Sequence, residues 1–235
     1  MDFNKKRILV VVAHPDDELL GLGATMHKLI NEHECVVRAI ILGEGITSRS
    51  DSRDPDSWQK ELEIHRNNIQ TAQKAIGYDS VRIYDFPDNR FDSVDLLDII
   101  KVVEKEKEVF EPEIIFTHHG GDVNIDHQRT FEAVITSTRP MDYEKVQTII
   151  TFETPSGTEW IASSEPRRFI PNLYIEVGEH NVDAKIKGME AYEFEKRKYP
   201  HPRSPEALKI LAQQRGVIVG KEYAEAFMII RTIIT

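Results

Sequence analysis

The chain has 235 residues, 40% of them hydrophobic, with a formal net charge of -10 and a single cysteine, Cys35. One cysteine excludes an intrachain disulfide and a cysteine-rich zinc module, and the acidic balance argues against nucleic acid as the main partner, because phosphate binding needs clustered Lys and Arg. No apolar run approaches the roughly 20 residues of a membrane helix and the N-terminus carries no cleavage signature, so we expect a soluble cytoplasmic protein without a transmembrane segment.

Short apolar runs alternate with longer segments of helical period, a pattern typical of βαβ units around a mainly parallel sheet. The strands we expect are Ile8–Ala13, Val36–Leu42, Val81–Tyr84, Ile114–Thr117 and Val146–Phe152. The helices we expect are Asp17–Asn31, Trp58–Ile76, Ser93–Val109 and Asp126–Thr138. We assign Ser93 as the N-cap of the third helix and Gly77 as the residue that ends the second.

The chain beyond about residue 153 is less regular, and there we expect helices over Asp183–Lys196 and Pro205–Arg215. No linker or low-complexity stretch divides the sequence, so residues 1–235 are predicted to form one domain. The apolar run Phe227–Ile230 suits either the core or a subunit interface. A homo-oligomer is therefore left open.

A first polar cluster, Ala13–Glu18, follows the apolar run Ile8–Val12. It lies at the carboxyl end of a buried strand, where open α/β sheets build their sites. His14 and Asp17 are three residues apart across the expected turn, so their side chains can converge on a metal ion. Acidic residues at the start of a helix also have a purely structural explanation, which the presence of His14 makes less attractive.

A second cluster, Thr117–His127, also follows an expected strand and opens onto a helix, so it should lie near the first cluster at the same sheet edge. Each histidine alone has a structural interpretation. A set of two histidines and one aspartate from both clusters, however, supplies the three-ligand open site typical of catalytic zinc. Iron(II) and cobalt(II) suit two nitrogens and one carboxylate as readily.

Three motifs resemble the PIG-L/LmbE family of metal-dependent sugar N-deacetylases: Ala13–Glu18, Gly21–Thr25 and Asp122-x-Asn124-x-Asp126-His127. The resemblance implies a Rossmann-like, three-layer αβα fold with a mainly parallel sheet and a site at the carboxyl ends of the strands. It also implies a zinc ion held by His14, Asp17 and His127, with Asp16 as general base. The last sixty or so residues match the family weakly.

Asn124 departs from the family pattern, which has a histidine there, held by the aspartate that corresponds to Asp126. That histidine helps the tetrahedral intermediate, so Asn124 and Asp126 are candidate catalytic residues. Asn124 can donate a hydrogen bond to an oxyanion but cannot release a proton at neutral pH. We favour Asp16 as both base and acid, with His118 or His119 as the alternative source of the proton.

Contacts to substrate are assigned to four residues. Arg66 and Arg139 resemble family arginines near the site, and Asp88 lies in the polar turn Asp85–Asp92, where it suits sugar hydroxyls. His118 is the fourth candidate. The proline-rich segment Tyr199–Pro205 either covers the pocket or forms a surface connection.

The function expected is zinc-dependent removal of the acetyl group from an N-acetylated amino sugar of the N-acetylglucosamine type. The family resemblance favours a role in glycan or surface-polysaccharide assembly, with the sugar carried on a nucleotide or a lipid. Two alternatives stay open. One is a catalytically impaired sugar-binding protein on the same fold, and the other is a different metallohydrolase such as a phosphoesterase, which would need a second metal.

Overall fold

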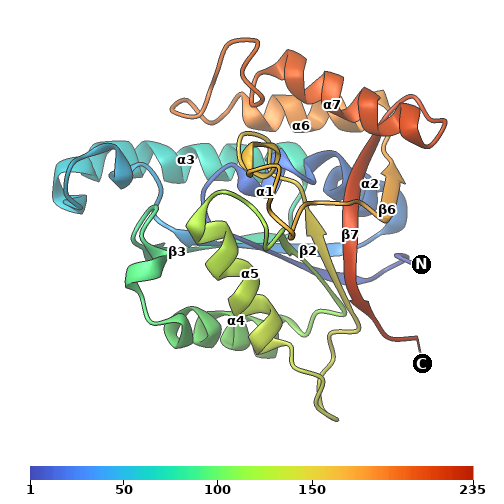
Figure 1. Ribbon diagram of the computed structural model, residues 1–235, viewed down its shortest axis with the longest axis horizontal. Helices are drawn as coiled ribbons and strands as arrows, with labels where there is room; N and C mark the ends of the chain where they lie inside the picture. Colours follow the sequence, from blue (N-terminus) through green and yellow to red (C-terminus); the bar gives the residue numbers. More distant parts are fainter. Residues whose placement is uncertain (235) are drawn as a thin grey trace.

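The computed structural model describes residues 1–234, and its centre is one seven-stranded sheet with the strand order β3-β2-β1-β4-β5-β7-β6. The strands are β1 (Arg7–Val12), β2 (Val36–Gly43), β3 (Ser80–Phe86), β4 (Ile114–His118), β5 (Thr148–Phe152), β6 (Leu173–Glu176) and β7 (Ala224–Thr232). The first five pair in parallel, whereas β7 is antiparallel to both β5 and β6. The predicted α/β fold with a mainly parallel sheet is confirmed (Figure 1).

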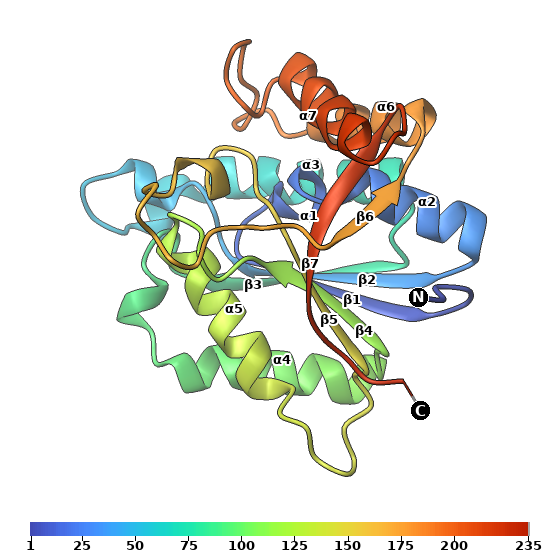
Figure 2. The same ribbon diagram turned by 45° about the vertical axis from the view of Figure 1, so that its right-hand side comes forward.

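Two helical layers cover the sheet (Figure 1, Figure 2). One face carries α4 (Leu96–Phe110) and α5 (Ile125–Ser137). The other face carries α1 (Asp17–Leu20), α2 (Gly23–His33) and α3 (Gln59–Ile76), and outside these lie α6 (Glu179–Met189) and α7 (Pro205–Ile218). Short 3-10 turns occupy Thr47–Arg49, Pro55–Trp58, Phe91–Ser93 and Thr158–Trp160. Within residues 1–234 no helix is both long enough and apolar enough to span a membrane.

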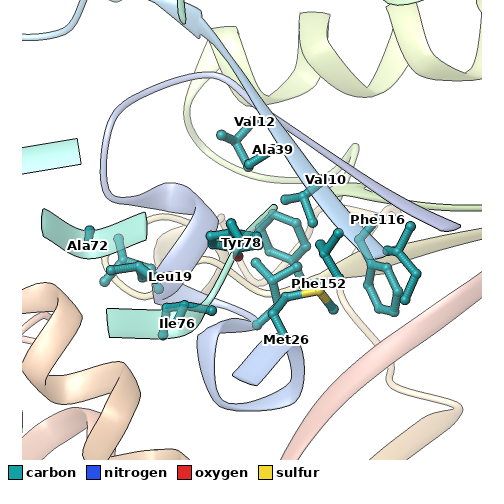
Figure 3. Packing of buried hydrophobic residues seen from close by; sticks show 14 of the residues in the cluster. Val10, Val12, Leu19, Met26, Ala39, Ala72, Ile76, Tyr78, Phe116 and Phe152 are labelled. Carbon is teal, nitrogen blue, oxygen red and sulfur yellow. The ribbon is translucent and has the colours of Figure 1, made fainter. Parts of the chain in front are cut away.

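The alternation of side chains along β1 divides the core in two. Val10 and Val12 face α1, α2 and α3, and Figure 3 shows them with Leu19 and Met26 of that layer. Leu9 and Val11 belong to the opposite cluster, beneath α4 and α5. Because both faces of β1 are covered, its run of apolar residues is continuous, as is usual for a parallel strand.

The helix predicted over Asp17–Asn31 is broken between α1 and α2 at Gly21 and Leu22. The cause is a close approach of two backbones. A Cβ atom on Gly21 would lie 2.3 Å from the carbonyl oxygen of Glu153 and 2.3 Å from the ring of Phe152. The end of β5 therefore packs directly against the end of α1, beside the site.

Ser93 does not cap the third helix, which begins at Leu96 after Asp95. Its hydroxyl instead donates to the carbonyl oxygen of Arg90 and ends a 3-10 turn. Gly77, by contrast, ends α3 as expected, with φ of 92°.

The C-terminal part differs most from the prediction. The run Phe227–Ile230 is part of β7, which pairs with β5, and β6 completes that edge. α6 ends at Met189 rather than at Lys196, and the following turn directs Tyr192 into the core, where its hydroxyl donates to Glu18. α7 runs three residues beyond Arg215 and is capped by Ser204.

Candidate metal centre and its cavity

Three predicted ligands converge at the carboxyl edge of the sheet. His14 lies in the turn between β1 and α1, Asp17 is the first residue of α1, and His127 lies in the first turn of α5. Oδ2 of Asp17 is 3.3 Å from Nδ1 of His14 and 3.3 Å from Nε2 of His127. One ligand atom from each residue lies within 4.8 Å of the other two. The topology therefore brings together residues more than a hundred positions apart.

The buried polar atoms of this group fit a cation. Within residues 1–234, Oδ1 of Asp17 and Nε2 of His127 are buried and make no hydrogen bond. A second grouping, His14 with Asp88 and Asp126, is as compact, but Oδ1 of Asp126 already accepts from the amide of Phe91. The set of two nitrogens and one carboxylate in His14, Asp17 and His127 matches the preferences of zinc, iron(II) and cobalt(II).

A carboxylate other than that of Asp17 lies next to each of the two candidate histidine ligands. Oδ2 of Asp126 lies 2.9 Å from Nε2 of His14, and Oδ1 of Asp122 lies 3.2 Å from Nδ1 of His127. Asp122 is in turn fixed by the hydroxyl of Thr158, which donates to its Oδ2 over 2.7 Å. Such carboxylates hold a ligating imidazole in one orientation and tautomer. Sequence reasoning missed the role of Asp122, although it belongs to the motif that suggested the family.

The charges of this group are strongly coupled. Burial raises the pKa of Asp17, but the imidazoles of His127 and His118 lower it more. The net result is a pKa well below the usual value for an aspartate. Burial lowers the pKa of His127, but Asp17 and Asp122 raise it to about 9. The pKa of His14 is raised well above its usual value because Asp126 and Asp17 outweigh burial. The protein thus concentrates negative charge where a cation would lie.

His118 lies beneath the metal ligands and not in the cavity. Its ring stacks on His127 with centroids 3.8 Å apart, and its side chain is completely buried. Nε2 accepts from the amide of Ala13, and Nδ1 faces the hydroxyl of Thr154 at 3.1 Å. Burial and the neighbouring His127 lower the pKa of His118 to about 4. The prediction that His118 contacts substrate is therefore not supported, because both nitrogens are occupied.

Asp16 stands beside the ligands with a strained backbone. Its φ of 102° is in the left-handed region that non-glycine residues rarely adopt. Its Oδ2 accepts from Nη1 of Arg203 over 2.7 Å. Burial raises the pKa of Asp16 well above its usual value, and Arg203 opposes that shift. Sequence reasoning missed Arg203 as a partner of the site.

The site opens into a cavity of about 300 Å³. Its polar wall is formed by His14, Asp16, Ser48, Arg49, His65, Asp88, Asn89, Asn124, Ser156, Glu195, Arg197, His201 and Arg203, with Trp160 at 55% exposure. The segment Tyr199–Pro205 contributes His201 and Arg203, so part of it lines the pocket. Asp88, which stays a predicted substrate contact, lines the cavity, and its Oδ2 accepts from the amide of Ser48.

Two predicted substrate residues are not brought to the cavity. Arg66 is on the exposed side of α3, although His65 beside it lines the wall. Arg139 follows the far end of α5 and lines a different hollow with Lys107 and Glu144. Because α5 has 13 residues, Arg139 lies roughly 20 Å from the first turn of that helix at 1.5 Å per residue.

Asn124 is the N-cap of α5 and also faces the cavity. Its Oδ1 accepts from the amide of Asp126 over 2.8 Å, which fixes the orientation of the side-chain amide. Nδ2 donates one hydrogen to Oδ1 of Asn89 over 3.0 Å. An amide nitrogen carries two hydrogens, so one remains to serve a group in the cavity.

The family model described as PIG-L, GlcNAc-PI de-N-acetylase, matches residues 9–138. The chain belongs to the PIG-L family. That span contains all three candidate metal ligands and Asp16. Arg203 and the rest of the C-terminal wall lie outside it.

Two relatives agree with membership of the PIG-L family, and a solved structure has the same fold. The protein of Escherichia coli (strain K12) named "Uncharacterized deacetylase YaiS" is 26% identical over 193 residues, 80% of this chain and 91% of that protein. A Bacillus anthracis protein named "Probable N-acetyl-alpha-D-glucosaminyl L-malate deacetylase 2" is 22% identical over 191 residues, 80% and 81% of the two chains. The N,N'-diacetylchitobiose deacetylase of Pyrococcus horikoshii has the same fold, with a TM-score of 0.71 and 17% identity over 96% of this chain and 84% of the other.

Proposed function

We propose that this chain is a zinc-dependent hydrolase that removes the acetyl group from an N-acetylated amino sugar of the N-acetylglucosamine type. The observation that carries the proposal is the position of Asp16, a buried carboxylate at the cavity wall directly beside the ligand set of His14, Asp17 and His127. The names of the relatives in the PIG-L family, which refer to acetylated sugars, support the same substrate class. Iron(II) and cobalt(II) are the alternative metals.

The chemical difficulty of the reaction explains the arrangement. An amide is a poor electrophile and neutral water is a poor nucleophile. A zinc ion held by His14, Asp17 and His127 would supply Lewis-acid polarisation of the acetyl carbonyl and a more acidic water. Asp126 and Asp122 would keep the two imidazoles in place.

Asp16 then moves the protons in this proposal. Its carboxylate accepts a proton from the attacking water, and the same carboxyl returns that proton to the sugar nitrogen as the carbon–nitrogen bond breaks. The products are acetate and the free amine. Asp16 in both roles is favoured because His118 has both nitrogens occupied and His119 directs Nε2 to the carbonyl oxygen of Arg167. Asn124 donates its second amide hydrogen to the oxyanion.

The partner in this proposal is a small-molecule sugar or sugar conjugate, acted on in the cytoplasm. A cavity of about 300 Å³ is at the lower end of the range for small-molecule sites, and it is partly open to solvent. It suits a single sugar ring with its acetyl group, while a nucleotide or lipid carrier would extend beyond the mouth. A role in surface-polysaccharide assembly belongs to the same proposal.

The proposal is tested by acetate release from free, nucleotide-linked and lipid-linked N-acetyl sugars by the zinc-loaded protein. We expect at least one substrate to yield acetate and free amine in equal amounts, and Asp16→Asn to abolish turnover while retaining zinc. Tight sugar binding without acetate from any substrate would favour a catalytically impaired binding protein instead. Release of phosphate in place of acetate would favour a phosphoesterase.

A further inference from the structure

Glu18 is a buried carboxylate that directly follows the candidate ligand Asp17, and the proposed mechanism assigns it no role. Its side chain is 2% exposed, and Glu18 is not among the residues that line the cavity. It therefore does not reach a substrate in the cavity. Any influence of Glu18 on the reaction has to pass through another residue, and its hydrogen bonds identify that residue.

The carboxylate of Glu18 is bonded to the main chain of Asp16. Oε2 accepts from the amide of Asp16 over 3.0 Å, and Oε1 accepts from the hydroxyl of Tyr192. All three residues are buried, so these hydrogen bonds are shielded from competition with solvent. Glu18 thus links the backbone of the proposed base to the segment that follows α6.

The backbone of Asp16 needs such support. Its φ of 102° and ψ of -27° lie outside the regions that residues other than glycine favour, and a strained conformation persists only where the surrounding structure fixes it. The carbonyl oxygen of Asp16 accepts from the amides of Leu19 and Leu20. The remaining main-chain group of Asp16, its amide, is the one that Glu18 holds. The direction in which the Asp16 side chain leaves the turn therefore depends on this hydrogen bond.

Asp16 is held at two points by residues that lie beyond the PIG-L match. Arg203 donates to its side chain, and Tyr192 donates to the Glu18 carboxylate that holds its amide. Tyr192 and Arg203 are joined through Glu195, which accepts from Arg203 and whose amide donates to the carbonyl oxygen of Tyr192 over 3.1 Å. A general base has to lie within roughly 3 Å of the proton that it takes, so a small displacement of the turn slows the reaction.

We propose that Glu18 is a positioning residue for the proton-transferring Asp16, and that the hydroxyl of Tyr192 holds the Glu18 carboxylate in the orientation that this role requires. The proposal rests on the function proposed above. Neither Glu18 nor Tyr192 lines the cavity, so their replacement should lower kcat and leave KM and metal affinity nearly unchanged.

Tyr192→Phe and Tyr78→Phe form a matched pair for the test. The hydroxyl of Tyr78 is also buried, but it donates to the main-chain carbonyl oxygen of Glu18 over 2.6 Å, whereas that of Tyr192 donates to the carboxylate. Each substitution removes one buried hydrogen bond to the same residue, so a merely structural effect would act on both variants alike. Glu18→Leu removes the acceptor of the Asp16 amide, and Glu18→Gln restores an acceptor oxygen on a side chain of the same length. The Gln variant also serves if the Leu variant folds poorly.

Steady-state acetate release gives kcat and KM, and competition with a chelator gives the zinc dissociation constant. Hydrogen exchange of the Asp16 amide, followed by NMR on isotope-labelled, zinc-loaded protein, reports on the bond to Glu18 without turnover. We expect Tyr192→Phe to lower kcat about tenfold and Tyr78→Phe less than about twofold, with KM and the zinc dissociation constant within about twofold in both. Glu18→Leu should lower kcat about 100-fold and speed exchange of the Asp16 amide about tenfold or more, and Glu18→Gln should reverse most of both changes.

Equal losses of kcat in Tyr192→Phe and Tyr78→Phe, or an Asp16 amide that exchanges no faster in Glu18→Leu, would overturn the proposal and leave the deacetylase intact. No acetate from the unchanged protein, together with the expected differences in amide exchange, would overturn the deacetylase while the bond from Asp16 to Glu18 stands. No acetate and no difference in exchange would overturn both.

Discussion

The guanidinium of Arg203 donates from Nη1 to Oδ2 of Asp16 over 2.7 Å, although the two residues are 187 positions apart in the chain. The same guanidinium donates to the Ser156 hydroxyl and to Glu195, so three hydrogen-bond acceptors hold it in place. Arg203 therefore both orients the proposed base and opposes the rise in its pKa that burial causes. The C-terminal segment is in this way part of the site.

Replacing Arg203 by Met should slow acetate release about 10- to 100-fold without loss of zinc. A loss of this size is expected when a general base is poorly positioned and largely protonated. Removing the positive charge lets burial raise the pKa of Asp16 further. Because only the carboxylate accepts a proton, the acidic limb of the kcat/KM profile should move to higher pH. Arg197→Met is the control, since Arg197 lines the cavity without contacting Asp16. An unmoved limb with unchanged kcat would contradict the assignment.

Asp122→Asn should weaken zinc binding by about 10- to 100-fold, the usual cost of losing a carboxylate behind a ligating histidine. The variant keeps the size of the side chain but removes the charge 3.2 Å from Nδ1 of His127. Competition with a fluorescent zinc chelator gives the dissociation constant. Asp142→Asn, at an exposed position, controls for the loss of one negative charge. Equal affinities in the two variants would show that Asp122 does not support His127.

Asp88→Ala should raise KM about tenfold, because Asp88 lines the cavity and its carboxylate suits a sugar hydroxyl. Arg139→Ala should leave kcat and KM within twofold of the original values, since Arg139 lies in a separate hollow. Steady-state kinetics of both variants on one substrate measures these changes in kcat and KM. A strong loss in Arg139→Ala would mean that the arginine reaches the substrate by a route absent from this structure.

Gly21→Ala should destabilise the fold by about 1–3 kcal/mol, the usual cost of an extra methyl group in a closely packed place. The added Cβ would meet the carbonyl oxygen of Glu153 and the Phe152 ring at 2.3 Å. Urea denaturation followed by circular dichroism measures the change. Ser163→Ala, at an exposed position, should change the free energy of unfolding by less than about 0.5 kcal/mol. A neutral Gly21→Ala would mean that β5 shifts freely away from α1.

The parallel part of the fold could be predicted from the sequence because its signals are local. Runs rich in apolar and β-branched residues marked β1 to β5, and the polar clusters after β1 and β4 marked the edge where the candidate ligands meet. The break at Gly21 escaped prediction because it depends on contact with Glu153, far along the chain. No local signal distinguishes such a glycine from one inside a helix.

The C-terminal strands and the wall that they support were missed for a related reason. β7 is antiparallel to its neighbours and part of its apolar run is half-buried, so its pattern is weaker than that of a central strand. The pairing of Arg203 with Asp16 depends on the packing of that entire region. Arg66 is exposed outside the cavity whereas its neighbour His65 lines it, because adjacent helix residues face different directions, which the motif alone does not reveal.

The measurement that tests the central claim most directly is acetate release from N-acetylglucosamine conjugates by the same protein sample before and after removal of its metal. The account predicts that chelation abolishes release, that about one equivalent of zinc restores it, and that neither His127→Ala nor Asp16→Asn recovers activity, although Asp16→Asn still takes up the zinc. Acetate release at the original rate from metal-free protein, or full activity in Asp16→Asn, would contradict it.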